Sequence, residues 1–177
     1  MRMILAAALA LAPHLALAAG SDDSEPPTPT ETTTVCDKGT VWDEKTKACI
    51  KAEESSLNDD QRYGAVRELA YAKRYDEALA ILALMTEGET SRVMTYQGFL
   101  LRQTGRVEEG IAAYERAIAM DPANILARSY YGQLLVQLDE PQLAQAQLDA
   151  IRQAGGTGTW AETALAGAIT TGVTYTY

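Results

Sequence analysis

The chain has 177 residues, with 24 Asp and Glu against 15 Lys and Arg, so its formal net charge is −9. This length fits one domain with terminal segments rather than two full-sized domains. The acidic balance argues against a nucleic-acid-binding protein, because such a protein needs a concentrated basic surface. Aromatic residues make up only 7% of the chain, with a single Phe. A core built mostly from Ala, Leu, Ile and Val suits closely packed helices better than β-sandwiches, and this predicts an all-α fold.

Residues 1–18 have the pattern of a cleaved export signal. Arg2 supplies a positive start, Ile4–Leu11 is an unbroken apolar run, and Ala16-Leu17-Ala18 has the small residues of a cleavage site. A transmembrane anchor is the alternative, but the apolar stretch is shorter than the about 20 residues that a spanning helix needs. The short leader and the Ala-rich composition resemble an exported protein of a Gram-negative bacterium. We therefore expect a periplasmic protein, cleaved near Ala18, with no stable membrane span in the mature chain.

The only histidine, His14, lies inside the predicted signal. Its removal leaves no imidazole for a nucleophilic triad, for acid–base catalysis or for a zinc site. The run Gly155–Gly158 lacks the Lys and Ser or Thr that complete a phosphate-binding loop. Pairs of acidic residues occur where helices are predicted to begin, and there they favour the helix dipole. We therefore expect no enzyme, no cofactor and no metal.

Residues 19–34 are predicted to be a disordered, acidic tether. The stretch Ser21–Thr34 contains three Pro, five Thr and four acidic residues, and it has no basic residue. Such a segment cannot bury enough apolar surface to offset the entropy that it loses on ordering. Folded structure is therefore expected to begin after residue 34.

Residues 35–50 are predicted to form a small hairpin closed by a disulfide. Cys36 and Cys49 are the only cysteines, and cysteines of an exported chain are expected to pair. The β-prone run Thr40–Trp42 is followed by a polar turn, after which the chain returns. The pattern resembles short cysteine-bracketed modules of exported bacterial repeat proteins and, more distantly, part of a chitin-binding module. Trp42 is accordingly either a platform for a sugar ring or the residue that covers the disulfide.

Residues 59–169 are predicted to be helical and repetitive. Ala78, Gly110 and Ala144 occupy equivalent places, and they are spaced by 32 and 34 residues. The segment Gly105–Asn124 is very like the second helix and exit turn of a tetratricopeptide repeat, which has a period of 34 residues. On these residues the chain resembles the tetratricopeptide repeat family.

The resemblance implies an all-α fold, a solenoid of about three helix-turn-helix repeats. The segment Trp160–Ile169 is predicted to be a capping helix, and residues 170–177 are predicted to be a short strand-like tail. Small residues let neighbouring helices approach, large ones fill the space between them, and a proline closes the unit. By the resemblance, these packing positions are Ala78, Gly98, Leu101, Gly110, Tyr114, Ala117, Pro122, Gly132, Ala144 and Leu148.

The family holds peptides or partner proteins on its concave face, which the first helix of each repeat lines. Carried over to this chain, that groove comprises Tyr63, Arg67, Tyr71, Arg92, Thr95, Phe99, Arg102, Gln103, Ser129, Gln133, Val136 and Gln137. Arginine beside aromatic residues suits an acidic or C-terminal peptide, whereas ion pairs on the helix surface are the alternative role of the arginines. Phe99 is expected to be exposed and to contact the partner.

The sequence thus predicts a non-catalytic periplasmic scaffold that binds another envelope protein or a peptide, and no nucleic acid. The alternative is a cell-wall glycan-binding protein in which Trp42 contacts the sugar.

Overall fold

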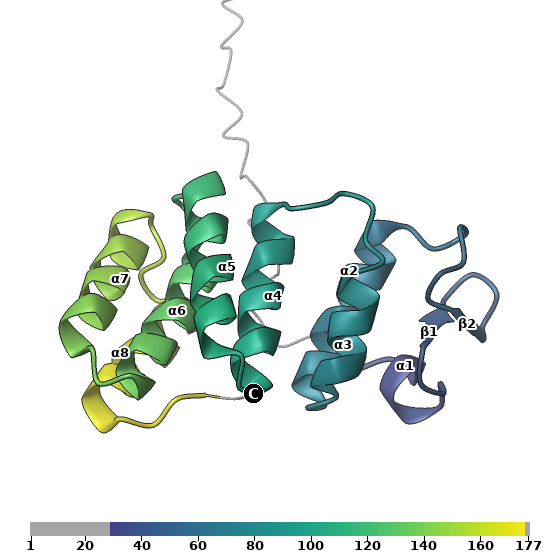
Figure 1. Ribbon diagram of the computed structural model, residues 1–177, viewed down its shortest axis with the longest axis horizontal. Coiled ribbons are helices and arrows are strands. Elements are labelled where there is room, and N and C mark those ends of the chain that lie inside the picture. Colours follow the sequence, from purple (N-terminus) through teal and green to yellow (C-terminus); the bar gives the residue numbers. More distant parts are fainter. Residues whose placement is uncertain (1–28, 176–177) are drawn as a thin grey trace, which may run out of the picture.

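The computed structural model describes residues 29–175 of the chain, in which a small hairpin region precedes an array of helices (Figure 1). The hairpin region comprises α1 (Glu31–Thr34), β1 (Thr40–Asp43) and β2 (Ala48–Lys51). The array comprises α2 (Asp59–Tyr71), α3 (Tyr75–Leu82), α4 (Ser91–Gln103), α5 (Val107–Met120), α6 (Ile125–Gln137), α7 (Pro141–Gln153) and α8 (Trp160–Thr171). The predicted signal and most of the predicted tether lie outside the described residues.

The helices form three consecutive pairs, α2 with α3, α4 with α5 and α6 with α7, and α8 packs against both α6 and α7. The first helices of the pairs contact one another along the array, α2 with α4, α4 with α6 and α6 with α8. The predicted all-α repeat fold, with its capping helix, is thereby confirmed. Between residues 29 and 175, none of the helices combines the length and the apolar character that crossing a membrane requires.

Each first helix begins with a side chain that caps its free N–H groups. Asn58 and Gln61 form a reciprocal capping box at the start of α2, and Asn124 accepts a hydrogen bond from Ala127 in α6. Helix α4 is capped by Thr90, whose side chain accepts a hydrogen bond from the Val93 amide. The caps fix where the first helices start, and so they place the residues of the candidate site.

Helices α4 and α5 approach each other closely at Gly98 and Gly110. A Cβ atom at Gly98 would lie 2.7 Å from the ring of Tyr114, and one at Gly110 would lie 3.1 Å from the carbonyl oxygen of Gly98. Tyr114 and Ala117 of α5 are fully buried. These positions therefore lie at the contact between α4 and α5.

The other predicted packing residues lie in equivalent places, with two differences. Buried side chains fill the space within or between pairs at Ala78, Leu101, Ala144 and Leu148. Gly132 faces Leu165 of the capping helix α8, whose Cδ2 would lie 2.5 Å from an added Cβ. Pro122 stands in the exposed turn between α5 and α6, where its carbonyl accepts a hydrogen bond from Arg128.

Strands β1 and β2 form the predicted antiparallel hairpin, with Trp42 opposite Cys49. The disulfide between Cys36 and Cys49 is present, with 5.5 Å between the Cα atoms, which confirms the predicted pairing. The prediction of disorder up to residue 34 was wrong for its last residues. They form the short helix α1, because Thr30 caps it and hydrogen bonds anchor it to the array.

The C-terminal tail is not the strand that its alternating residues predicted. Helix α8 continues to Thr171 and ends at Gly172, which adopts the left-handed conformation at φ 71°. Residues 173–175 then run back along the array towards α4 without regular structure (Figure 1). The Val173 amide donates to the Thr171 hydroxyl, and Thr174 and Tyr175 hydrogen-bond to glutamine side chains of α6, so these bonds form without a second strand.

Candidate functional site

The first helices bring the predicted groove residues onto one face, which we call the first-helix face. A row of aromatic rings runs beneath it from one repeat to the next. Tyr63 of α2 meets Tyr96 of α4 with 5.4 Å between ring centroids, and Tyr96 meets Tyr130 of α6 at 6.2 Å. Tyr130 in turn meets Trp160 of α8 at 6.0 Å. The row therefore links all three repeats and the capping helix.

Phe99 belongs to this row, and the prediction that it is exposed was wrong. Only 1% of its surface is accessible. Its ring lies 5.0 Å from that of Tyr130 in the next repeat and 6.2 Å from that of Tyr75 in α3. Tyr63 is also buried. Both residues therefore support the face from within.

The three predicted arginines have different roles. Arg92 forms ion pairs with Glu87 at 2.8 Å and with Asp60 at 2.7 Å, and its guanidinium lies over the ring of Tyr63. The hydrogen bond to Glu87 is the main cause of the raised pKa of Arg92. The alternative role as a surface ion pair therefore applies to Arg92.

Arg102 is buried and organises polar groups of the next repeat. Its Nε donates to Oε1 of Gln137 at 2.9 Å, and its Nη1 donates to the backbone carbonyl of Tyr130 at 3.2 Å. Burial lowers the pKa of Arg102, against the opposing effect of the nearby Tyr114 hydroxyl. A buried guanidinium that holds a neighbouring amide serves to position that amide rather than to meet a partner.

Of the remaining predicted residues, Thr95, Ser129 and Gln133 are buried, and the others lie at or near the surface. Tyr71, at the end of α2, is 43% exposed, and Arg67 and Gln103 are half-buried. Nε of Arg67 donates to the Tyr96 hydroxyl at 3.3 Å. Gln133 of α6 is completely buried. Fewer residues than predicted therefore present a polar or aromatic group at the surface of this face.

The C-terminal tail contacts this face at α6. Nε2 of Gln137 donates to the Thr174 hydroxyl at 2.6 Å, and the Tyr175 amide donates to Oε1 of Gln133 at 2.9 Å. The repeat positions alone gave no signal for this contact, because the tail is not part of any repeat. Two side-chain amides of α6 thus hold one side-chain hydroxyl and one main-chain N–H of the tail.

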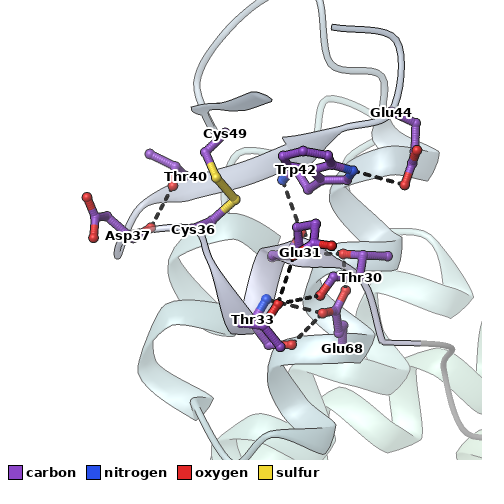
Figure 2. The surroundings of a disulfide bond; sticks show 12 residues. Thr30, Glu31, Thr33, Cys36, Asp37, Thr40, Trp42, Glu44, Cys49 and Glu68 are labelled. Carbon is purple, nitrogen blue, oxygen red and sulfur yellow. Dashed lines mark hydrogen bonds between the residues drawn. A yellow bond between two sulfur atoms is a disulfide. The ribbon is translucent and has the colours of Figure 1, made fainter. Parts of the chain in front are cut away.

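A second concave feature lies between the hairpin and α2. It is a cleft of about 310 Å³ lined by Trp42, Glu44, Gln61, Arg67 and Glu68 together with neighbouring residues. Figure 2 shows the Trp42 indole above α1, where its Nε1 donates to Glu44 at 3.0 Å. The indole is half-buried, whereas Val41, at 2% exposure, supplies the apolar core of the hairpin.

Glu68 fixes α1 against this cleft and was not singled out from the sequence. The carboxylate is buried, and it accepts hydrogen bonds from the hydroxyls of Thr30 and Thr33, each at 2.6 Å, and from the Thr33 amide (Figure 2). A Glu in mid-helix gives no sequence signal for such a role, since its partners lie 35 or more residues away. The hairpin region is thus docked on the first repeat.

Within the part of the chain that the structure describes, no three His, Cys, Asp or Glu side chains gather as metal ligands would.

Comparison with protein families supports the repeat assignment. The family profile described as tetratricopeptide repeat matches residues 101–162, from the end of α4 to the start of α8. Comparisons with curated proteins and with solved structures find no match. The matched segment contains the buried Tyr114 and Ala117 of α5 and the whole α6–α7 pair. On this match and on its stacked helix pairs, residues 101–162 resemble tetratricopeptide repeats, and the array has a tetratricopeptide-repeat-like fold.

Proposed function

We propose that this chain is a non-catalytic periplasmic scaffold that binds an extended peptide or a segment of a partner protein on its first-helix face. Tetratricopeptide repeats are protein-interaction modules, and that general role follows from the family match. The observation that carries the more specific proposal is the extended tail segment that Gln133 and Gln137 hold on this face. A face that already satisfies one extended chain is suited to another.

The proposed contact surface extends from α6 towards the end of α2. The aromatic row beneath it is buried, so it serves as a rigid support. Above it, Tyr71 offers an exposed ring, and Arg67 and Gln103 offer hydrogen-bond donors. Tyrosine and arginine are the residues that most often dominate the free energy of protein binding. The partner is expected to lie across these side chains.

The export of the chain is part of the proposal. The leader pattern in residues 1–18 supports it, as does the disulfide between Cys36 and Cys49, because such bonds persist in oxidising compartments. An alkaline phosphatase fusion placed after residue 34 tests export directly. Activity in the periplasm supports the proposal, and a fusion retained in the cytoplasm contradicts it.

Site-specific photo-crosslinking in cells tests the binding face. A photoreactive phenylalanine is placed at Tyr71, on the first-helix face, and separately at Leu143 of α7. These residues are similarly exposed, at 43% and 51%, so the pair controls for accessibility. We expect a discrete protein adduct from position 71 and none from position 143. Equal adducts from both positions, or adducts from position 143 alone, would contradict the proposed face.

The cleft beside Trp42 favours a second candidate function, the binding of a cell-wall glycan. A half-buried indole next to Glu44, Gln61 and Arg67 combines a ring platform with hydrogen-bonding groups. Sedimentation with purified cell-wall sacculi tests this function by comparing wild type with Trp42→Ala and Trp42→Phe. Co-sedimentation that is lost with Ala and retained with Phe supports a stacking site. Absence of co-sedimentation in the wild type rejects this candidate.

A further inference from the structure

The tail contact at α6 has a defined hydrogen-bonding pattern. Gln133 is completely buried although it stands on the first-helix face, and its Oε1 accepts the backbone N–H of Tyr175. Its Nε2 is directed to the hydroxyl of Ser129, one turn earlier in α6, at 3.4 Å. With the amide nitrogen committed in this way, Oε1 is the atom left to face the tail. Gln133 therefore accepts a main-chain N–H.

The side-chain amide of Gln137 has the opposite orientation to that of Gln133: its nitrogen, not its oxygen, faces the tail. Arg102 carries only donors, so its Nε can bond only to Oε1 of Gln137. This leaves Nε2 of Gln137 as a donor, and it meets the Thr174 hydroxyl at 2.6 Å. Gln137 therefore requires an acceptor atom on the side chain that it contacts. The buried Arg102, from the preceding repeat, is the positioning residue for this requirement.

The two glutamines together read two consecutive residues of an extended chain. The first residue must carry a side-chain acceptor, such as the hydroxyl of Thr or Ser, and the second must have a free N–H. A Lys at the first position would oppose one donor with another, and a Pro at the second would leave the buried Gln133 oxygen without its partner. The tail meets both conditions at Thr174 and Tyr175.

The ring of Tyr175 adds a third contact. It passes over α8 beside Gly167, where an added Cβ would lie 3.9 Å from Cε2 of the ring. The ring remains 53% exposed, so most of its surface is available to solvent. The aromatic group therefore contributes less selectivity than the two amides.

We propose that Gln133, Gln137 and Arg102 form a recognition site for an extended segment with a hydroxyl residue followed by a non-proline residue, and that the chain's own tail occupies this site until a partner displaces it. The inference rests on the proposed function, because it names the chemistry of the partner at the same face. The tail follows directly on α8, so its local concentration at the site is high. A short tether of this kind gives an effective concentration in the millimolar range, roughly. The tail therefore competes with any partner segment.

Amide hydrogen exchange of the full chain, followed by NMR, tests whether the tail is docked. We expect the Tyr175 amide to exchange at least about fivefold more slowly than in a free peptide of the same sequence, since its hydrogen bond has a buried acceptor. Gln133→Met removes that acceptor at similar volume and should restore the rate of the free peptide. Gln145→Met, the same substitution on α7 away from the tail, should leave the rate unchanged. A Tyr175 amide that exchanges at the free-peptide rate in the wild type overturns the inference.

Binding of a fluorescent peptide tests the recognition rule. The probe has the sequence of residues 172–177, Gly-Val-Thr-Tyr-Thr-Tyr. It is titrated against wild type and against Tyr175→Pro, a full-length variant whose own tail cannot donate to Gln133. We expect Tyr175→Pro to bind the probe at least about tenfold more tightly than wild type, because its site is vacated. Circular dichroism of the variant confirms that the helices are intact.

Probe variants then separate the two halves of the rule. A probe with Lys in place of the first Thr, and one with Pro in place of the first Tyr, should each bind Tyr175→Pro at least about fivefold more weakly than the parent probe. Equal binding of all probes, or equal binding of the parent probe to wild type and Tyr175→Pro, overturns the inference.

The two proposals fail in distinguishable ways. If exchange and probe binding agree with the recognition site but no partner crosslinks at position 71, the scaffold function fails while the tail site stands. If a partner crosslinks at position 71 but the Tyr175 amide is unprotected, the scaffold function stands and the tail site fails.

Discussion

The packing of α4 against α5 predicts that Gly98→Ala destabilises the protein. A Cβ atom at position 98 would lie 2.7 Å from Cδ1 and Cε1 of Tyr114 and 2.9 Å from Cγ. Real Cβ atoms do not approach a ring so closely, so either the ring or the helix must move. Tyr114 is fully buried, and its ring stacks on that of Tyr131, with 5.9 Å between centroids. The ring therefore cannot turn aside without disturbing α6.

The magnitude follows from two opposing effects. Overpacking of a buried site costs about 1–3 kcal/mol. Replacement of Gly by Ala inside a helix stabilises by about 0.5–1 kcal/mol, because Ala loses less conformational freedom. Gly98→Ala is therefore expected to lower the free energy of unfolding by up to about 2 kcal/mol.

Gly64→Ala in α2 is the matched control. Gly64 is also inside a helix, but it is exposed, and an added Cβ would meet no atom within 4 Å. This variant should be more stable than wild type by about 0.5–1 kcal/mol. Urea unfolding followed by circular dichroism at 222 nm measures both variants. If Gly98→Ala and Gly64→Ala change the free energy of unfolding by the same amount, the close approach of α4 and α5 is not what requires glycine.

Three further predictions concern the hairpin region and α2, at the N-terminal end of the array. Reduction, or the double substitution of Cys36 and Cys49 by Ser, should destabilise the hairpin region by about 3 kcal/mol, as expected for a loop of this length, while circular dichroism shows that most helix remains. Burial raises the pKa of Asp59, but hydrogen bonds from Thr86, Glu87 and Arg62 outweigh it and hold that pKa below its ordinary value. Asp59→Asn should therefore be less stable than wild type at pH 7, and urea unfolding should show that difference begin to shrink as the pH falls below about 4, the ordinary pKa, and vanish only below the lowered pKa of the folded state. Glu68→Ala should detach α1 from α2, which hydrogen exchange detects as loss of protection at the Thr33 amide; unchanged protection would show that other contacts, such as those of Arg74 with the Thr32 and Thr33 carbonyls, hold α1.

The repeat architecture could be predicted because its signal is local and recurs. Gly98 lies in α4, and the two residues that it faces, Gly110 and Tyr114, lie in the next helix, α5, fewer than 20 positions later. A stripe of small and large residues is dictated by geometry within a single repeat. The hairpin could be predicted for the same reason, since its two cysteines are near in sequence and alone in the chain.

Exposure on the first-helix face could not be predicted, because it depends on neighbouring repeats. Phe99 stands at a groove position by repeat register, yet Tyr130 of the following repeat and Tyr75 of the preceding one cover its ring. The anchoring of α1 by Glu68 and the contact of the tail with Gln133 could not be predicted for a similar reason. Each joins residues more than 30 positions apart, and neither partner belongs to a periodic pattern.

The buried aromatic row and the polar surface above it have different roles in the proposed binding: the row gives rigid support, and the surface makes the contacts. Because the aromatic rings are packed against one another, they cannot open a deep apolar pocket for a partner without loss of contacts between repeats. Recognition must therefore rely on main-chain hydrogen bonds, which select for extended shape, and on a few exposed side chains such as Tyr71. Hydrogen bonds of this kind contribute about 1 kcal/mol each, so a two-residue match is weak by itself. A natural partner that displaces the tail must then extend beyond α6 towards α2, where Tyr71 is exposed.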